Sequence, residues 1–101
     1  MDNAALVAAI RAEFNQPGDA YLAGGPVFVE TFGGAVYVVF PDDAYRLKVV
    51  ASNLEGGGVW VDMALMTSGA GVYEVVSLVV QTGGVADVVA EVGAFARVWV
   101  L

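Results

Sequence analysis

Three stretches of alternating side chains, joined by two short turns, constrain this chain more than any other feature. The stretches are residues 26–32, 35–40 and 45–51, and the turns are Gly33-Gly34 and Asp42-Asp43. Two glycines supply the positive φ angles of a two-residue hairpin, and aspartate is common in turns. Counting residues outward from either turn assigns each side chain to the same face of an antiparallel sheet. Because a slip of one residue would invert a strand, this agreement predicts a meander.

The two turns also predict the register of these three strands. Each turn fixes the cross-strand pairs, which are counted outward from its two loop residues. The expected pairs are Phe28–Val39, Glu30–Tyr37, Tyr37–Lys48 and Val39–Arg46. The alternate positions carry mainly valine and leucine, so we expect one face of the sheet to form the core.

A fourth strand is predicted for residues 59–66, which alternate again after the glycine-rich loop 52–58. No short turn fixes its register. We expect Lys48 to lie opposite Asp62, because opposite charges stabilise cross-strand pairs.

Helices are predicted at both ends of the chain. In residues 3–14 an apolar stripe recurs at helical spacing, and Asp2 or Asn3 can cap this helix. Residues 85–99 place their large apolar side chains within one arc of about 120°. In residues 72–81, Glu74, Ser77 and Gln81 have the spacing of a helix. Valine favours strands, so strands in this last third of the chain are the alternative.

The expected fold is therefore α+β with two layers, in a single domain that covers residues 1–101. It consists of an N-terminal helix, a four-stranded antiparallel meander and two C-terminal helices. The alternative is an all-β fold in which the C-terminal third forms strands.

The second face of the predicted sheet mixes aromatic and charged side chains. The candidate binding residues on it are Phe28, Glu30, Phe32, Tyr37, Val39, Arg46, Lys48, Trp60 and Asp62. A solvated face of an antiparallel sheet is normally polar, whereas aromatic residues mixed with arginine are typical of protein interfaces. The alternative is that a helix covers this face and makes it part of the core.

The composition excludes many kinds of chemistry. The chain has no cysteine and no histidine, so it lacks thiol nucleophiles, zinc–thiolate sites and the commonest general base. Asp42-Asp43 and the glycine pairs stand in no calcium, phosphate or dinucleotide motif. Four basic residues are too few to neutralise a phosphate backbone. We therefore expect no catalysis, no cofactor, no metal and no nucleic acid.

Membrane insertion is also disfavoured. The longest charge-free stretch, between Glu74 and Asp87, has twelve residues, whereas a spanning helix needs about 20. The first residues lack the basic segment of a signal peptide, so a cytoplasmic protein is expected.

These observations favour a small acidic protein that binds another protein through its second sheet face. Inhibitors, immunity factors and chaperone-like adaptors are classes of protein that fit this combination of small size, acidic charge and an apolar binding face. The net charge of −7 would steer the chain toward a basic surface, and we expect a homodimer that associates through the sheet face. The alternatives are a structural subunit of a phage or mobile-element assembly and, less favoured, a small-ligand-binding domain.

Overall fold

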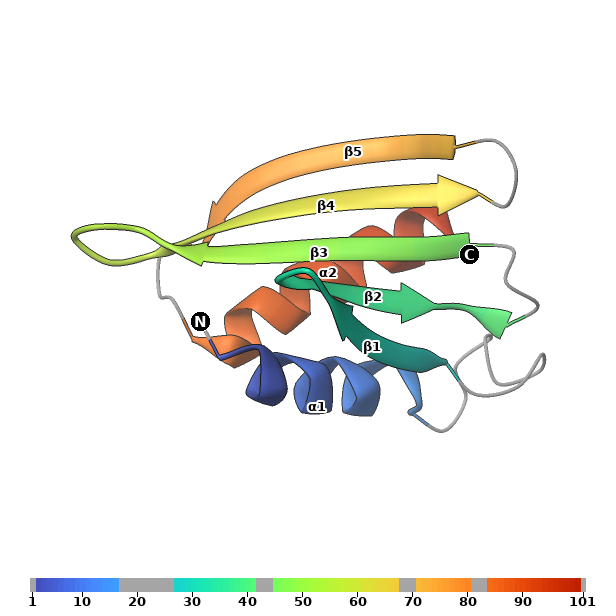
Figure 1. Ribbon diagram of the computed structural model, residues 1–101, viewed down its shortest axis with the longest axis horizontal. Helices are drawn as coiled ribbons and strands as arrows, with labels where there is room; N and C mark the ends of the chain where they lie inside the picture. Colours follow the sequence, from blue (N-terminus) through green and yellow to red (C-terminus); the bar gives the residue numbers. More distant parts are fainter. Residues whose placement is uncertain (1, 17–26, 42–44, 68–70, 81–83, 101) are drawn as a thin grey trace.

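The computed structural model describes residues 2–16, 27–41, 45–67, 71–80 and 84–100. Within them the chain forms α1 (Asn3–Phe14), β1 (Phe28–Phe32), β2 (Ala35–Val39), β3 (Tyr45–Asn53), β4 (Val59–Thr67), β5 (Gly71–Val80) and α2 (Val85–Trp99). The strands pair in sequence order in one antiparallel sheet. In Figure 1, α2 crosses behind the sheet and α1 runs alongside β1. The predicted α+β class is confirmed.

The register of the first three strands is the one predicted from the turns. Glu30 lies opposite Tyr37, Tyr37 lies opposite Lys48, and the other two expected pairs are also present. Gly33 and Gly34 have φ angles of 60° and 81°, which the hairpin turn requires and which other residues rarely adopt. The turn predicted at Asp42-Asp43 lies outside the described residues.

The predicted register of the fourth strand is wrong by two residues. Asp62 lies opposite Val50, and Lys48 lies opposite Ala64. The physical reason is the length of the loop. β3 continues to Asn53, and the turn is closed by a 3.1 Å hydrogen bond from the Leu54 amide to the Gly58 carbonyl. This compact glycine turn sets the register, and a single cross-strand charge pair is too weak to override it.

The helix predicted for residues 72–81 is also wrong, because residues 72–80 belong to strand β5 and residue 81 lies outside the described residues. Burial alternates along it from Val75, which is exposed, through Val76 and Leu78, which are half-buried, to Val80, which is buried. Valine occupies both faces of the strand, so the sequence does not show this alternation, and the preference of valine for strands prevails over the helical spacing of the polar residues. Among the described residues the sheet has five strands and a single helix follows it, which corrects the expected four and two.

The core lies between the helices and one face of the sheet. Its buried side chains are Leu6, Ile10 and Phe14 of α1, Val88, Val92 and Ala96 of α2, and Val36, Val38, Leu47, Val49, Val61, Met63 and Leu65 of the sheet. The helical stripes predicted for residues 3–14 and 85–99 thus face the core. Asp2 caps α1 by accepting a 3.0 Å hydrogen bond from the Ala4 amide.

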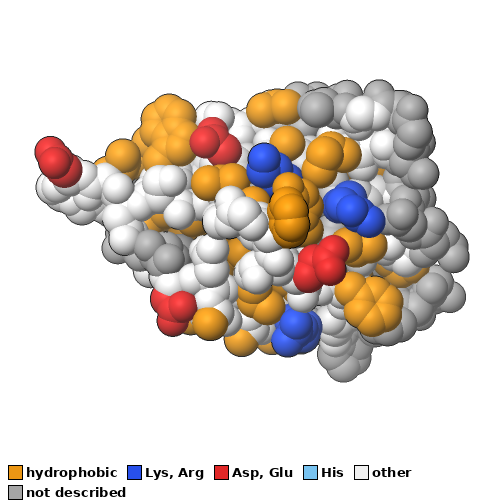
Figure 2. All heavy atoms as spheres, viewed as in Figure 1, with side chains coloured by type: hydrophobic (Ala, Val, Ile, Leu, Met, Phe, Trp, Pro, Cys, Tyr) orange, Lys and Arg blue, Asp and Glu red, His pale blue; other side chains and the backbone are white. Residues whose placement is uncertain are grey.

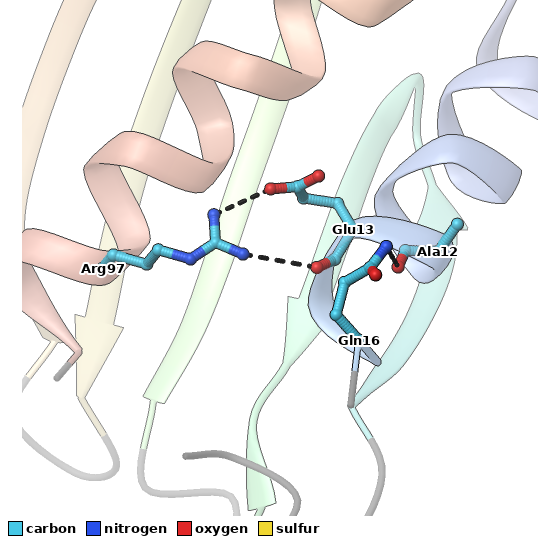
Figure 3. Close-up of polar contacts among 4 residues, drawn as sticks. All are labelled: Ala12, Glu13, Gln16 and Arg97. Carbon is cyan, nitrogen blue, oxygen red and sulfur yellow. Dashed lines mark hydrogen bonds and ion pairs between the residues drawn. The ribbon is translucent and has the colours of Figure 1, made fainter. Parts of the chain in front are cut away.

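A polar contact fixes the two helices against each other. The Arg97 guanidinium donates to the Glu13 carboxylate at 2.8 Å and to the Glu13 carbonyl at 3.4 Å (Figure 3). A Cβ atom at Gly93 would lie 2.6 Å from the Arg97 guanidinium. Glycine at this buried position therefore leaves room for the contact. Figure 3 also shows a hydrogen bond at the C-terminal end of α1, in which the side-chain amide of Gln16 donates to the Ala12 carbonyl at 3.0 Å.

A substitution at Leu47 tests whether the core lies where the structure places it. The Leu47→Ala variant should lose about 3 kcal/mol of unfolding free energy, because the side chain is fully buried and a cavity would remain. The matched variant Leu54→Ala, at a residue that is 38% exposed, should lose less than about 1 kcal/mol. Urea denaturation measures both. Equal losses would show that Leu47 does not lie in the core.

Candidate functional site: the open face of the sheet

Both helices pack on one face of the sheet, so no described helix covers the other face. We call this other face the open face. Its side chains are Phe28, Glu30, Phe32, Tyr37, Val39, Arg46, Lys48, Val50, Ser52, Trp60, Asp62, Ala64, Met66, Val75, Ser77 and Val79. All nine candidate residues from the sequence are among them. Figure 2 shows this face, where lysine, arginine and acidic side chains lie among hydrophobic ones.

The large aromatic residues of the open face are accessible to solvent. Phe28 is 65% exposed, Phe32 is 78% exposed and Trp60 is 41% exposed. Tyr37 and Val39, on the more central strand β2, are half-buried by their neighbours. The interpretation in which a helix seals this face as core therefore does not apply to the described residues.

A row of side chains crosses the sheet at its centre. Glu30, Tyr37 and Lys48 lie side by side on β1, β2 and β3, as the sequence predicted. Ala64 occupies the fourth place in this row, and Asp62 lies two residues further along β4. The expected charge pair between Lys48 and Asp62 is therefore replaced by a small apolar neighbour, which leaves room beside the lysine.

A hollow of about 480 Å³ lies beside this row. Its lining residues are Glu30, Thr31, Phe32, Tyr37, Arg46, Lys48 and Met66. Two of the four basic residues of the chain thus share one hollow with a carboxylate and two aromatic rings. This hollow can accept an apolar side chain of a partner. Its basic and acidic groups can pair with a charge of either sign next to that side chain.

Asp62 organises the region of the open face nearest to β5. Its carboxylate accepts a 2.9 Å hydrogen bond from the Trp60 indole and a short one from the Ser77 hydroxyl. The Ser77 hydrogen bond, followed by that of Trp60, lowers the pKa of Asp62 below its ordinary value. The aspartate therefore positions the indole instead of neutralising a lysine.

Sequence reasoning missed Ser77, Val75 and Val79 as members of this face. The segment is predicted as a helix from its polar spacing, and a helix would have placed these residues elsewhere. The one available signal was the valine content of residues 72–80.

The described residues hold no group of three acidic side chains that could bind a metal ion. No helix among them is long and apolar enough to cross a membrane. Comparison with protein-family models, with curated proteins and with solved structures gives no match for this chain. The open face is therefore interpreted from its own residues.

The Asp62 carboxylate gives a pH-dependent prediction. A lowered pKa in the folded state means that the carboxylate stabilises the fold at neutral pH. This contribution should disappear as the pH falls through the folded-state pKa of Asp62. The Ser77→Ala variant should raise that pKa toward its ordinary value, because the strongest hydrogen bond is lost. NMR titration of the Asp62 side chain measures the shift.

The matched variant for this titration is Ser52→Ala, which removes an exposed hydroxyl on β3 of the same face. It should leave the pKa of Asp62 unchanged. An Asp62 pKa that is the same in the Ser77→Ala variant and the unmodified chain would contradict the assigned contact.

Proposed function

We propose that this chain is a small non-catalytic module that binds a partner protein through its open face. The observation that carries the proposal is the exposure of Phe28, Phe32 and Trp60 on a sheet face that no described helix covers. Exposed aromatic residues around a few charges are the usual anchors of a protein interface. An inhibitor, an immunity factor or a chaperone-like adaptor would use such a surface.

The shape of the hollow favours a protein over a small ligand. Phe32, which contributes to its wall, is 78% exposed. Small-molecule sites normally bury most of the ligand surface between opposed walls. The hollow instead lies on a broad sheet face, and a protruding side chain of a partner could enter it while the surrounding surface covers Phe28 and Trp60.

The charges act at two distances. At long range the net charge of −7 attracts a basic partner and speeds its approach. At contact, Lys48 and Arg46 lie in the hollow next to Glu30. We therefore propose a partner of net positive charge whose contact patch is apolar and carries an acidic group that meets Lys48. A cytoplasmic location and the absence of nucleic-acid binding belong to the same proposal.

Phe32 provides the sharpest test. Affinity capture with the tagged chain should retain a protein that the Phe32→Ala variant loses. On the purified pair, calorimetry should show a dissociation constant raised at least about tenfold, because an exposed aromatic anchor is removed. The unfolding free energy should change by less than about 0.5 kcal/mol, because Phe32 makes little contact in the free chain.

The control variant is Val98→Ala, which shortens an apolar side chain that is 71% exposed on α2. It should bind as the unmodified chain does. A partner that is retained equally by Phe32→Ala and lost by Val98→Ala would place the binding surface on the helices. A small molecule retained in native mass spectrometry would favour the ligand-binding alternative, and an open series of oligomers in light scattering would favour the structural-subunit alternative.

A further inference from the structure

Lys48 lies between two hollows of the open face. It lines the hollow of about 480 Å³ beside the central row, which we call the larger hollow, and a smaller hollow of about 190 Å³. Phe32 of β1 and Tyr37 of β2 line the larger hollow. Asp62 and Ala64 of β4 line the smaller one, on the other side of β3. The two hollows therefore follow one another across the sheet, with the only lysine of the chain between them.

The smaller hollow contains two opposite charges that do not pair with each other. Lys48 is half-buried and forms no hydrogen bond or ion pair with any residue that the structure describes. Asp62 accepts from Trp60 and from Ser77 with the same oxygen, Oδ1. Within the described part of the chain, Oδ2 has no donor. The ammonium group and this oxygen are thus both available to charges of a partner.

The charges on the open face determine which groups a partner must bring. A partner that covers this face removes water from Lys48 and Asp62, and burial of an unpaired charge costs free energy. The hydrogen bonds from Ser77 and Trp60 lower the pKa of Asp62, so its carboxylate is ionised at neutral pH. A complementary partner surface therefore carries an acidic group for Lys48 and a basic group for Asp62.

The spacing of the two charged residues favours an extended segment. Lys48 lies opposite Ala64, and Asp62 is two residues away from Ala64 on the same strand. Such diagonal neighbours lie about 7 Å apart. Side chains two residues apart in a strand are separated by about 6.6 Å, whereas neighbours on a helix surface are about 5–6 Å apart. An acidic and a basic residue two positions apart in an extended segment therefore match Lys48 and Asp62.

We propose that the open face binds an extended segment of a partner protein with the pattern apolar-x-acidic-x-basic. The acidic side chain meets Lys48, the basic one meets Oδ2 of Asp62, and the apolar one enters the larger hollow beside Phe32 and Tyr37. The residues written x face away from the sheet, as alternate residues of a strand do. This inference rests on the proposed function and adds to it the order of charges in the bound segment.

A second copy of this chain does not provide such a segment. The sequence contains no apolar-x-acidic-x-basic pattern in either direction. Two chains of net charge −7 also repel each other, whereas a partner of net positive charge is attracted. The homodimer that the sequence led us to expect is therefore the competing arrangement.

Three capped pentapeptides test the order of charges, because they share one composition and one net charge. The matching peptide is Phe-Thr-Glu-Thr-Lys. Phe-Thr-Lys-Thr-Glu exchanges the two charges, and Phe-Thr-Thr-Glu-Lys places them on opposite faces of an extended chain. In NMR titrations at low salt, the matching peptide should bind with a dissociation constant about fivefold lower than either isomer. The amide signals of Lys48 and Asp62 should be among those that shift.

A charge reversal at Asp62 gives the sharper test. The Asp62→Lys variant should bind Phe-Thr-Glu-Thr-Glu about fivefold more tightly than Phe-Thr-Glu-Thr-Lys, which reverses the preference of the unmodified chain. The matched control Glu55→Lys changes the net charge equally, at an exposed position in the turn between β3 and β4. It should keep the original preference. Circular dichroism checks that both variants fold.

The inference is overturned if the three isomers bind equally, or if none of them binds at millimolar concentration. It is also overturned if Asp62→Lys keeps the original preference, because Asp62 would then not contact the segment. Partner capture that is lost in Phe32→Ala would still support the proposed function in these cases, so the two failures are distinguishable. A dimer of the unmodified chain whose dissociation shifts the Lys48 and Asp62 signals, with no response to the peptides, would assign the open face to a second copy.

Discussion

Within the part of the chain that the structure describes, helices cover only one side of the sheet, and the remaining features follow from that constraint. Adjacent strands lie about 4.8 Å apart and helices pack about 10 Å apart, so two helices roughly match the width of five strands. α1 and α2 share one apolar core and are also linked by the ion pair between Arg97 and Glu13, and together they cover one face. Among the described elements none is left to cover the aromatic residues of the other face.

The helix pair is also displaced toward β1, and this displacement makes the two edges of the sheet unequal. Arg11 of α1 and Asn15 just after it bind backbone groups in the region of β1. At the far side, α2 and β5 flank a hollow lined by half-exposed residues such as Leu78 and Phe95. Side chains of the same chain thus bind backbone groups at the β1 edge of the sheet.

The sequence predicted those regions of the fold in which a local constraint decides the geometry. Gly33-Gly34 fixed the first hairpin, and the stripes of residues 3–14 and 85–99 identified both helices. The register of β4 depended on a loop whose length the glycines did not reveal, and a charge pair was a poor guide to it. β5 was missed because valine on both faces of this edge strand hides the alternation that identifies a strand. Most of the open face was predictable, since it lies on the strands whose register the turns determine.

Trp60 lies on the open face, next to the edge strand β5. Its backbone is opposite Val79 at the β5 edge, and its indole donates to Asp62, which also accepts from Ser77 of β5. The orientation of an exposed aromatic residue on the open face therefore depends on a hydroxyl at the centre of the edge strand.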